Sequence, residues 1–276
     1  MDISRSGFYK WKKRMENPSE KVISRFSNIK LFIEYHSKYP SHGYRWLNAK
    51  IRLDTGLILT DNYAHKCCKY AGIRSKAKHA RYKKPKDNTR IFPNLLLAGI
   101  TPDRPYKVIV SDMTAFKVKD IYYEITFYMD LFNNEIAAYG LSYRRGDTHS
   151  YYDGLNELIE KKKEYKDLEL VLHTDQGSVY SSKSYNELLL LHNITHSMSN
   201  AGCPTENGAM EAINGWIKEE LFIDFHIQEC DDVTSFIKKY IKYFNEARPA
   251  YSLMYLTPKE YKQRYYQTEE VPSKED

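Results

Sequence analysis

The sequence predicts an α/β protein, in which a small, basic, all-helical domain precedes a mixed five-stranded sheet with flanking helices. Two observations support this prediction. Before about residue 73, apolar residues recur at helical spacing between turn signals. After residue 105, three β-rich segments are followed by alternating helical and strand-like segments. The chain of 276 residues, 42% apolar and 28% charged, is long enough for a substantial core.

The composition argues against a membrane or secreted protein. The chain has no run of eighteen apolar residues, and its first residues, MDISRSGFYKWKKR, lack the apolar core of a secretion signal. The four cysteines form no C-x-x-C pair and have no histidine pair at zinc spacing. We therefore expect a cytoplasmic protein with reduced thiols and no membrane segment.

Charge is distributed unevenly along the chain. Residues 1–90 hold 22 Lys and Arg against 7 Asp and Glu, whereas the remainder holds 20 against 29. Aromatic residues are interleaved with the cations of the first segment. A basic excess that persists over ninety residues and contains aromatic side chains predicts binding to nucleic acid.

Three helices are predicted in the basic segment, over residues 22–39, 43–56 and 61–73. Pro40 ends the first helix, and Asp61 is the expected N-cap of the third. Short helices joined by tight turns in a basic segment resemble a helix-turn-helix module. The sequence therefore predicts a DNA-binding segment over residues 1–73.

The next segment, residues 74–104, is predicted to be a basic linker. Its first part, RSKAKHARYKKPKDNTR, has many cations and almost no aliphatic residues, so we expect it to lie along DNA. The candidate DNA contacts of the helical segment and linker are Arg45, Arg74, Lys76, Lys78, Arg81, Lys83 and Lys84.

The second half of the chain has the element order of a ribonuclease-H-like fold. Three strands are predicted over residues 106–118, 121–133 and 135–144, with Asn133-Asn134 as a hairpin turn. Helix, strand, helix, strand and helix follow, over residues 147–163, 168–173, 181–192, 193–198 and 209–222. We place this domain, with a C-terminal helix, at residues 105–265 and expect a disordered tail over residues 266–276.

Two acidic residues mark strands that are neighbours in such a fold. Asp112 is predicted to end the first strand and Asp175 the fourth, and these strands lie side by side at the centre of the sheet. Two carboxylates held close together repel each other unless a cation lies between them. Ligation by oxygen alone selects a hard divalent ion, Mg²⁺ or Mn²⁺.

A third acid is expected from the helix over residues 209–222 or the loop before it. The candidates are Glu206, Glu211, Glu219 and Glu220. Glu206 and Glu211 differ by about 140° around a helix axis, so both cannot face one metal ion. Glu211 shares a polar stripe with Lys218, which is rotated by only about 20°, and with Asn207. These arguments favour Glu211 but leave Glu206 open.

The three acids and their surroundings resemble a known family. Asp112, Asp175 and Glu211 have the D, D(35)E arrangement. The segments HTDQGSVYSS, SMSNAGCPTENGAMEAINGWIK and FNEARPAYSLMYLTPKEY resemble ordered blocks of bacterial insertion-sequence transposases that are read from two overlapping frames. Their second-frame, OrfB-type product has a core like that of retroviral integrases. The resemblance spans roughly residues 4–261.

The resemblance implies a DDE transposase that cleaves DNA strands at insertion-sequence ends and joins the freed 3′-hydroxyl to another strand. It implies two Mg²⁺ or Mn²⁺ ions held by Asp112, Asp175 and Glu211, with DNA contacts from Lys218 and supporting contacts from Gln176, Ser178 and Asn207. The implied partners are double-stranded DNA, at terminal inverted repeats and target sites, further copies of the chain on that DNA, and an upstream-frame OrfA protein.

The sequence departs from the family pattern at a few positions. Ser111 replaces a usual Thr, Glu206 replaces an Asp, and Ile213 and Asn214 stand where two aromatics are common; Tyr251 falls where a His is usual. Two alternatives therefore remain at this point. One is a catalytically inactive DNA-binding relic or repressor, and the other is a ribonuclease-H-like nuclease that only hydrolyses.

Overall fold

The structure is a computed structural model that describes residues 4–77, 92–165, 168–199 and 208–269. The chain forms two compact units, Met1–Ala77 and Lys78–Asp276, which are considered separately below. None of the described helices has the length and apolar character needed to span a bilayer.

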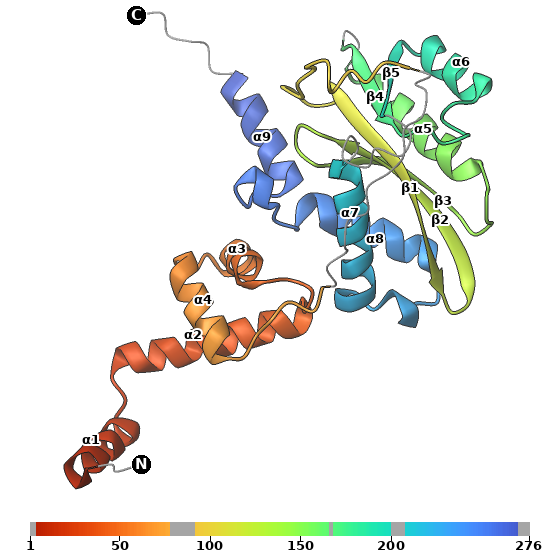
Figure 1. Ribbon diagram of the computed structural model, residues 1–276. Helices are drawn as coiled ribbons and strands as arrows, with labels where there is room; N and C mark the ends of the chain where they lie inside the picture. Colours follow the sequence, from red (N-terminus) through yellow and green to blue (C-terminus); the bar gives the residue numbers. More distant parts are fainter. Residues whose placement is uncertain (1–3, 78–91, 166–167, 200–207, 270–276) are drawn as a thin grey trace, which may run out of the picture. The chain divides into compact units, whose positions relative to one another are not determined.

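Four helices make up the first unit: α1 (Arg5–Glu16), α2 (Glu20–Lys38), α3 (Tyr44–Thr55) and α4 (Asp61–Tyr70). α2, α3 and α4 pack together around a small core and confirm the three helices predicted from periodicity (Figure 1). The buried residues of that core are Phe32, Tyr35, Leu47, Ile51, Ala64, Cys67 and Cys68.

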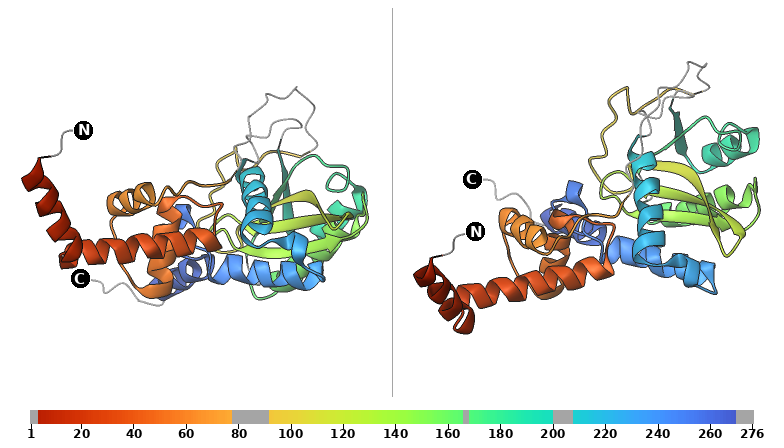
Figure 2. Two further views of the ribbon diagram at one scale, coloured as in Figure 1. Left: turned by 90° about the horizontal axis from the view of Figure 1, so that it is seen from below. Right: turned by 60° about the horizontal axis from the view of Figure 1, so that its bottom comes forward.

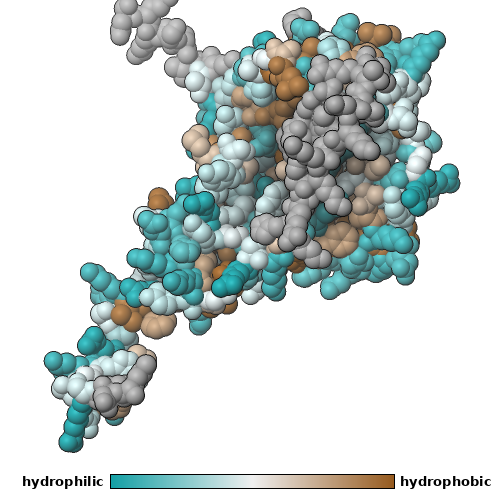
Figure 3. Space-filling model, viewed as in Figure 1, coloured by the Kyte–Doolittle hydropathy of each residue, from teal (hydrophilic) through white to brown (hydrophobic). Residues whose placement is uncertain are grey.

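The first unit differs from the prediction in three respects. α1 was not predicted, and it has no buried residue; the side chains of Phe8 and Trp11 are about half exposed. The N-cap of α4 is Thr60 instead of Asp61, because the hydroxyl oxygen of Thr60 accepts a hydrogen bond from Tyr63 N at 3.3 Å. The unit continues beyond residue 73, where Lys76 N donates to the carbonyl of Pro40 at 2.9 Å. Hydrophilic residues cover most of the surface of α1–α4 that is visible in Figure 3.

The second unit contains one mixed sheet, in the order β3-β2-β1-β4-β5. Its strands are β1 (Val108–Val118), β2 (Ile121–Asp130), β3 (Ile136–Ser142), β4 (Leu170–Thr174) and β5 (Ile194–Met198). β2 is antiparallel to both β1 and β3, whereas β4 is parallel to β1 and to β5. This confirms the predicted ribonuclease-H-like sheet, with the first and fourth strands adjacent.

Helices cover both faces of this sheet (Figure 1). α5 (His149–Lys162) and α6 (Lys183–Leu191) pack on one face, over a core that includes Ile109, Tyr128 and Leu155. α7 (Gly208–Glu219), a π-helical turn (Glu220–Asp224) and α8 (Val233–Glu246) pack on the other face. α9 (Pro258–Glu269) packs against α8. α7 (blue-green in Figure 2) lies beside β1.

The close approach of α5 to β3 depends on two glycines. A Cβ atom added to Gly140 would collide with the backbone carbonyl of Ser150, and one added to Gly154 would collide with the ring of Tyr128. Because α5 follows β3 directly, this contact fixes the first turn of α5, including Tyr151, near the sheet.

The ends of the second unit also differ from the sequence-based boundaries. Residues 92–104 fall within the second unit, although they were assigned to the linker. Leu95 N donates to Ser197 Oγ at 2.9 Å, and Met198 N donates to the carbonyl of Pro93 at 3.3 Å, so this segment covers the outer edge of β5. α9 continues to Glu269, four residues into the expected tail.

Candidate active site

Asp112 lies inside a strand, although the sequence predicted that it ends one. β1 has eleven residues and Asp112 is the fifth of them, paired with Phe127 of β2. The pairing of β1 with β4 stops earlier, at Val110 and His173. Asp112 therefore lies where β4 separates from β1. The predicted range of residues 106–118 agrees with the observed strand, so only the expectation that Asp112 ends it was wrong.

Asp175 follows β4 at the same level of the sheet as Asp112. It comes directly after Thr174, the last residue of β4, and is two residues beyond His173, as Asp112 is two residues beyond Val110. Side chains two residues apart in a strand share a face. Asp112, which lies inside β1, therefore projects from the face of Val110, on which α7 packs.

One hydrogen bond shapes the loop after β4, and a second holds that loop against β1. Gly177 N donates to Asp175 Oδ1 at 2.8 Å, and a Cβ atom on Gly177 would lie only 2.9 Å from that oxygen. Further along the loop, the Tyr180 hydroxyl and Ser111 Oγ are 2.8 Å apart, and both are buried. Since Ser111 precedes Asp112 in β1, this bond fixes the loop of Asp175 relative to Asp112.

The pKa values of Tyr151 and Tyr180 are raised, mainly by burial and in part by the charges of Asp112 and Asp175. Burial, together with the charges of Asp175, Glu124 and Asp112, raises the pKa of Tyr151 to about 12. Burial also raises the pKa of Tyr180, with smaller contributions from Tyr128 and the same two aspartates. Asp175 forms no ion pair with any residue that the structure describes.

α7 brings further candidates to the same place. Asn214 Nδ2 donates to Asp112 Oδ2 at 2.9 Å. Glu211 belongs to α7 and precedes Asn214 by three residues. The side chain of Glu211 and all of Glu206 and Asn207 lie outside the described residues. Lys218, one turn after Asn214, is half-buried.

The donor groups of Asp112 and Asp175 fit a hard divalent cation. Both offer carboxylate oxygens, the ligand type that such ions prefer. Met113 N and Asn214 donate to the oxygens of Asp112, and Gly177 N donates to Asp175, so these bonds orient the carboxylates. Within the described side chains, no three His, Cys, Asp or Glu residues cluster as a metal site. Glu211, the expected third ligand, is not among those side chains, so the third ligand remains a prediction.

The predicted DNA contacts fall into three groups. Gln176 and Ser178 lie on the loop after Asp175, where Ser178 is exposed. Arg74 and Lys76 are exposed in the first unit, and Arg45 there lies 4.0 Å from Asp61 and against the ring of Tyr44. The four remaining cations, Lys78, Arg81, Lys83 and Lys84, are outside the described residues.

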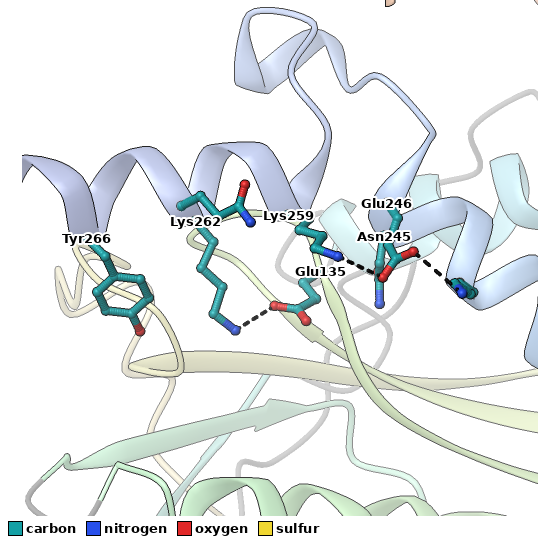
Figure 4. Close-up of a pocket in the computed structure, with 8 residues that line it drawn as sticks. Glu135, Asn245, Glu246, Lys259, Lys262 and Tyr266 are labelled. Atoms are coloured by element: carbon teal, nitrogen blue, oxygen red, sulfur yellow. Dashed lines mark hydrogen bonds and ion pairs between the residues drawn. The ribbon is translucent and has the colours of Figure 1, made fainter. Parts of the chain in front are cut away.

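A separate pocket of about 380 Å³ lies between α8, α9 and the turn after β2 (Figure 4). Its charges are largely balanced: Lys262 Nζ lies 2.9 Å from Glu135 Oε2, and Lys259 Nζ lies 3.0 Å from Glu246 Oε1. It contains neither Asp112 nor Asp175.

Asn214 and Tyr180, which contact β1 at or beside Asp112, were not predicted as functional. Asn214 occupies a buried position on the side of α7 that carries Met210 and Ile217. The same apolar stripe continues to Leu221 in the π-helical turn. The spacing of residues 210, 214, 217 and 221 could have revealed a polar residue on the core side. The pairing of Tyr180 with Ser111 spans 69 positions and has no local signal.

Comparison with known proteins identifies the family. An integrase core domain model matches residues 102–204, and a second integrase core domain model matches residues 192–258. The transposase for insertion sequence element IS904 of Lactococcus lactis is 30% identical over 77% of this chain and 84% of its own length. The chain belongs to the transposases of bacterial insertion sequences. The transposase is therefore an enzyme of the polynucleotidyl transferase class.

Further similarities extend over most of the transposase. The putative transposase InsK for IS150 of Escherichia coli K12 is 28% identical over 96% of this chain and 92% of its own length. A chain of the simian T-cell lymphotropic virus intasome has a TM-score of 0.49 and 16% identity, covering 89% of this chain and 76% of that one. The HTLV-2 integrase catalytic core in complex with magnesium has a TM-score of 0.44 and 18% identity, covering 57% of this chain and 96% of that one.

Proposed function

We propose that the transposase is a DDE enzyme in which Asp112, Asp175 and Glu211 hold two Mg²⁺ or Mn²⁺ ions at the edge of β1 and β4. The observation that supports this most directly is the matched position of Asp112 and Asp175, each two residues beyond the last β1–β4 pair. The third acid is on α7, whose Asn214 contacts Asp112. When bound, the ions supply activation of the attacking oxygen and stabilisation of the leaving 3′ oxygen.

The protein residues bind and orient the DNA. Lys218, on the same side of α7 as Asn214, contacts a phosphate near the scissile bond. Gln176 and Ser178 approach the DNA from the loop after Asp175, and Asn207 from the loop before α7. Two displacements at phosphorus follow. Water cleaves a phosphodiester at the element end and leaves a 3′-hydroxyl, and that hydroxyl then attacks a phosphodiester of a second strand, whose own 3′ oxygen leaves.

The basic first unit and the linker supply most of the affinity for DNA. Arg45, Arg74 and Lys76 contact phosphates from the first unit, and Lys78, Arg81, Lys83 and Lys84 do so from the linker. The substrates are the terminal inverted repeats and target DNA. Further copies of the chain, and an OrfA protein from the upstream frame, complete the assembly on that DNA.

The test uses the full chain with labelled duplexes that carry the DNA sequences flanking its own gene. In Mg²⁺ or Mn²⁺ we expect a nick that leaves a 3′-hydroxyl, followed by joined products. Asp175→Asn should lower both by at least about 10³-fold, because several kcal/mol of transition-state stabilisation is lost. Its fold and DNA binding should be retained, since Asn can still accept the hydrogen bond from Gly177 N.

Asp120→Asn is the matched control. Asp120 is exposed in the turn between β1 and β2, and its positive φ of 68° is one that Asn tolerates. This variant should cleave and join DNA like the native protein. Strand transfer by Asp175→Asn would contradict the assignment. DNA binding without cleavage by the native chain would favour an inactive DNA-binding protein, and cleavage without joining would favour a nuclease.

A further inference from the structure

One polar side chain is buried on the apolar side of α7. Met210 and Ile217 on this side, and Leu221 in the π-helical turn that follows, are at most 1% exposed and pack in the core against the sheet. Asn214 lies among them, at 5% exposure. A helix normally places an apolar residue at such a position, so the amide requires an explanation.

The contacts of Asn214 point to Asp112. Its Nδ2 donates to Asp112 Oδ2 at 2.9 Å, whereas its Oδ1 is buried and has no hydrogen-bond partner in the part of the chain that the structure describes. Rotating the amide by 180° would place Oδ1 against the carboxylate, so the orientation is determined by charge. An unpaired buried oxygen destabilises the fold, and a leucine of similar size would avoid that cost but would also lose the bond to Asp112. Because the two effects oppose each other, stabilisation of the fold does not by itself account for the amide.

We propose that Asn214 is a positioning residue, which holds the Asp112 carboxylate in its cation-binding orientation and ties α7 to it. This inference rests on the proposed function, because it takes Asp112 as a metal ligand. Met113 N and Asn214 Nδ2 each bind one oxygen of Asp112, at 2.9 Å in both cases.

The neutrality of this donor matters for metal binding. A lysine or arginine in the same place would fix the carboxylate equally well but would compete with a divalent cation for its charge. An amide orients the carboxylate and leaves its charge in place. The same bond links β1 to α7 one turn after Glu211, so it also sets the position of the helix that carries the third predicted acid.

The inference is tested first with Asn214→Leu, a change that removes the donor and the unpaired oxygen while keeping a similar volume. The full chain without DNA is titrated with Mn²⁺, and binding is followed by calorimetry and by the midpoint of thermal unfolding. We expect Asn214→Leu to have an unfolding midpoint in chelator at least as high as that of the native chain. Its affinity for Mn²⁺ should be about 10–100-fold weaker. DNA cleavage should recover at a correspondingly higher Mn²⁺ concentration, which a purely structural defect would not do.

Asn245→Leu is the matched control. Asn245 lies on α8 and bonds the backbone of Ile136 through both its amide nitrogen and its oxygen. Its replacement should lower the midpoint in chelator and leave the Mn²⁺ affinity unchanged. We thus expect Asn214→Leu to weaken Mn²⁺ binding without lowering the midpoint, and Asn245→Leu to lower the midpoint without weakening Mn²⁺ binding. This pattern would distinguish positioning of the metal ligand from stabilisation of the fold.

Asn214→Asp tests the orientation of the amide. It places an acceptor against Asp112, so the midpoint in chelator should fall, and Mn²⁺ should raise it by more than in the native chain. An undiminished midpoint in chelator, or an unchanged Mn²⁺ affinity in Asn214→Leu, overturns the inference.

Asp112→Asn, measured in parallel, separates the two proposals. If it loses the Mn²⁺ response while Asn214→Leu retains it, the proposed metal site stands and the inference about Asn214 fails. If the native chain itself does not bind Mn²⁺, both fail.

Discussion

Two carboxylates beside α7, those of Glu220 and Asp112, receive hydrogen bonds from different kinds of donor. Just after the C-terminal end of α7, Glu220 is fully buried and accepts hydrogen bonds from Arg248 Nε at 2.6 Å and from the Tyr240 hydroxyl at 2.8 Å. In the middle of α7, the neutral amide of Asn214 donates to Asp112, and Asp175, which follows β4, forms no ion pair among the described residues. The buried carboxylate of Glu220 is thus bound by a cation of the protein, whereas Asn214 offers Asp112 a neutral donor. We infer, in line with the proposed function, that the acid pair at the sheet edge binds a metal cation.

Breaking the Glu220 pair gives the largest expected effect on stability. Glu220→Gln leaves the charge of Arg248 buried without its partner, so we expect a loss of about 3–5 kcal/mol in the free energy of unfolding, measured by denaturant titration. The Mn²⁺-dependent rise in the unfolding midpoint should persist, because the acid pair is intact.

The control for this change replaces both partners. A Glu220→Leu, Arg248→Met double variant removes both charges and should be far less destabilised than Glu220→Gln. If Glu220→Gln folded normally but lost the Mn²⁺ response, the distinction between Glu220, which is paired within the protein, and the metal-binding acid pair would be wrong.

His196 extends the comparison to a buried group that the fold keeps neutral. Burial, and then the charge of His173, lowers its pKa to about 4. The folded state therefore binds fewer protons than the unfolded state between pH 4 and about 6.5, so stability falls as the pH drops through this window. The fall is about 3 kcal/mol. His196→Gln should remove it, measured as the difference in unfolding free energy between pH 7 and pH 4.5.

The buried carboxyl of Asp130 changes stability with pH in the opposite direction, so it must be present in both proteins that are compared. Burial raises its pKa to about 6, so its contribution falls as the pH rises from about 4 to 6. Because Asp130 is present in both proteins, the difference between native and His196→Gln isolates the histidine. Identical pH dependence in the two proteins would contradict a neutral buried His196.

The bond between Tyr180 and Ser111 is expected to have a moderate effect. Tyr180→Phe leaves a buried Ser111 hydroxyl without this partner and should cost about 1–3 kcal/mol of stability. A double-mutant cycle with Ser111→Ala measures the coupling, and the two changes together should cost less than their sum. Strict additivity would show that the bond does not hold the loop of Asp175 against β1.

Lys218→Ala gives the smallest expected effect. The loss of one phosphate contact should weaken DNA binding modestly and reduce the slope of log affinity against log salt by about 0.9. Lys183→Ala, which removes an exposed cation paired with Glu187 on α6, is the control. An unchanged slope for Lys218→Ala would remove Lys218 from the DNA interface.

The order of strands and helices could be predicted because each element has its own local pattern. The alternation over residues 106–144 and the turn at Asn133-Asn134 were sufficient for the three antiparallel strands, and Asn134 indeed has a positive φ of 57°. α1 was missed because it buries nothing, so its sequence carries no constraint from a core. The N-cap of α4 was assigned one residue late, since Thr60 and Asp61 are both good caps.

The candidate site was predictable only in part. Asp112 and Asp175 could be selected because each accompanies a buried strand and a known motif, but the length of β1 beyond Asp112 depends on its pairing with β2. The contacts of Asn214 with Asp112 and of Arg248 with Glu220 join residues 102 and 28 positions apart. No local pattern specifies such pairs, because they depend on how α7 and α8 pack on the sheet.

The most direct test of the account is thermal unfolding of the full chain and of Asp112→Asn over a range of Mn²⁺ concentrations. A cation bound between Asp112 and Asp175 stabilises the folded state by about 2.7 kcal/mol at one hundred times its dissociation constant. We predict that the midpoint of the native chain rises with Mn²⁺ concentration and that this rise is lost in Asp112→Asn. No rise in the native chain, or an equal rise in both proteins, would contradict a metal site at this edge of the sheet.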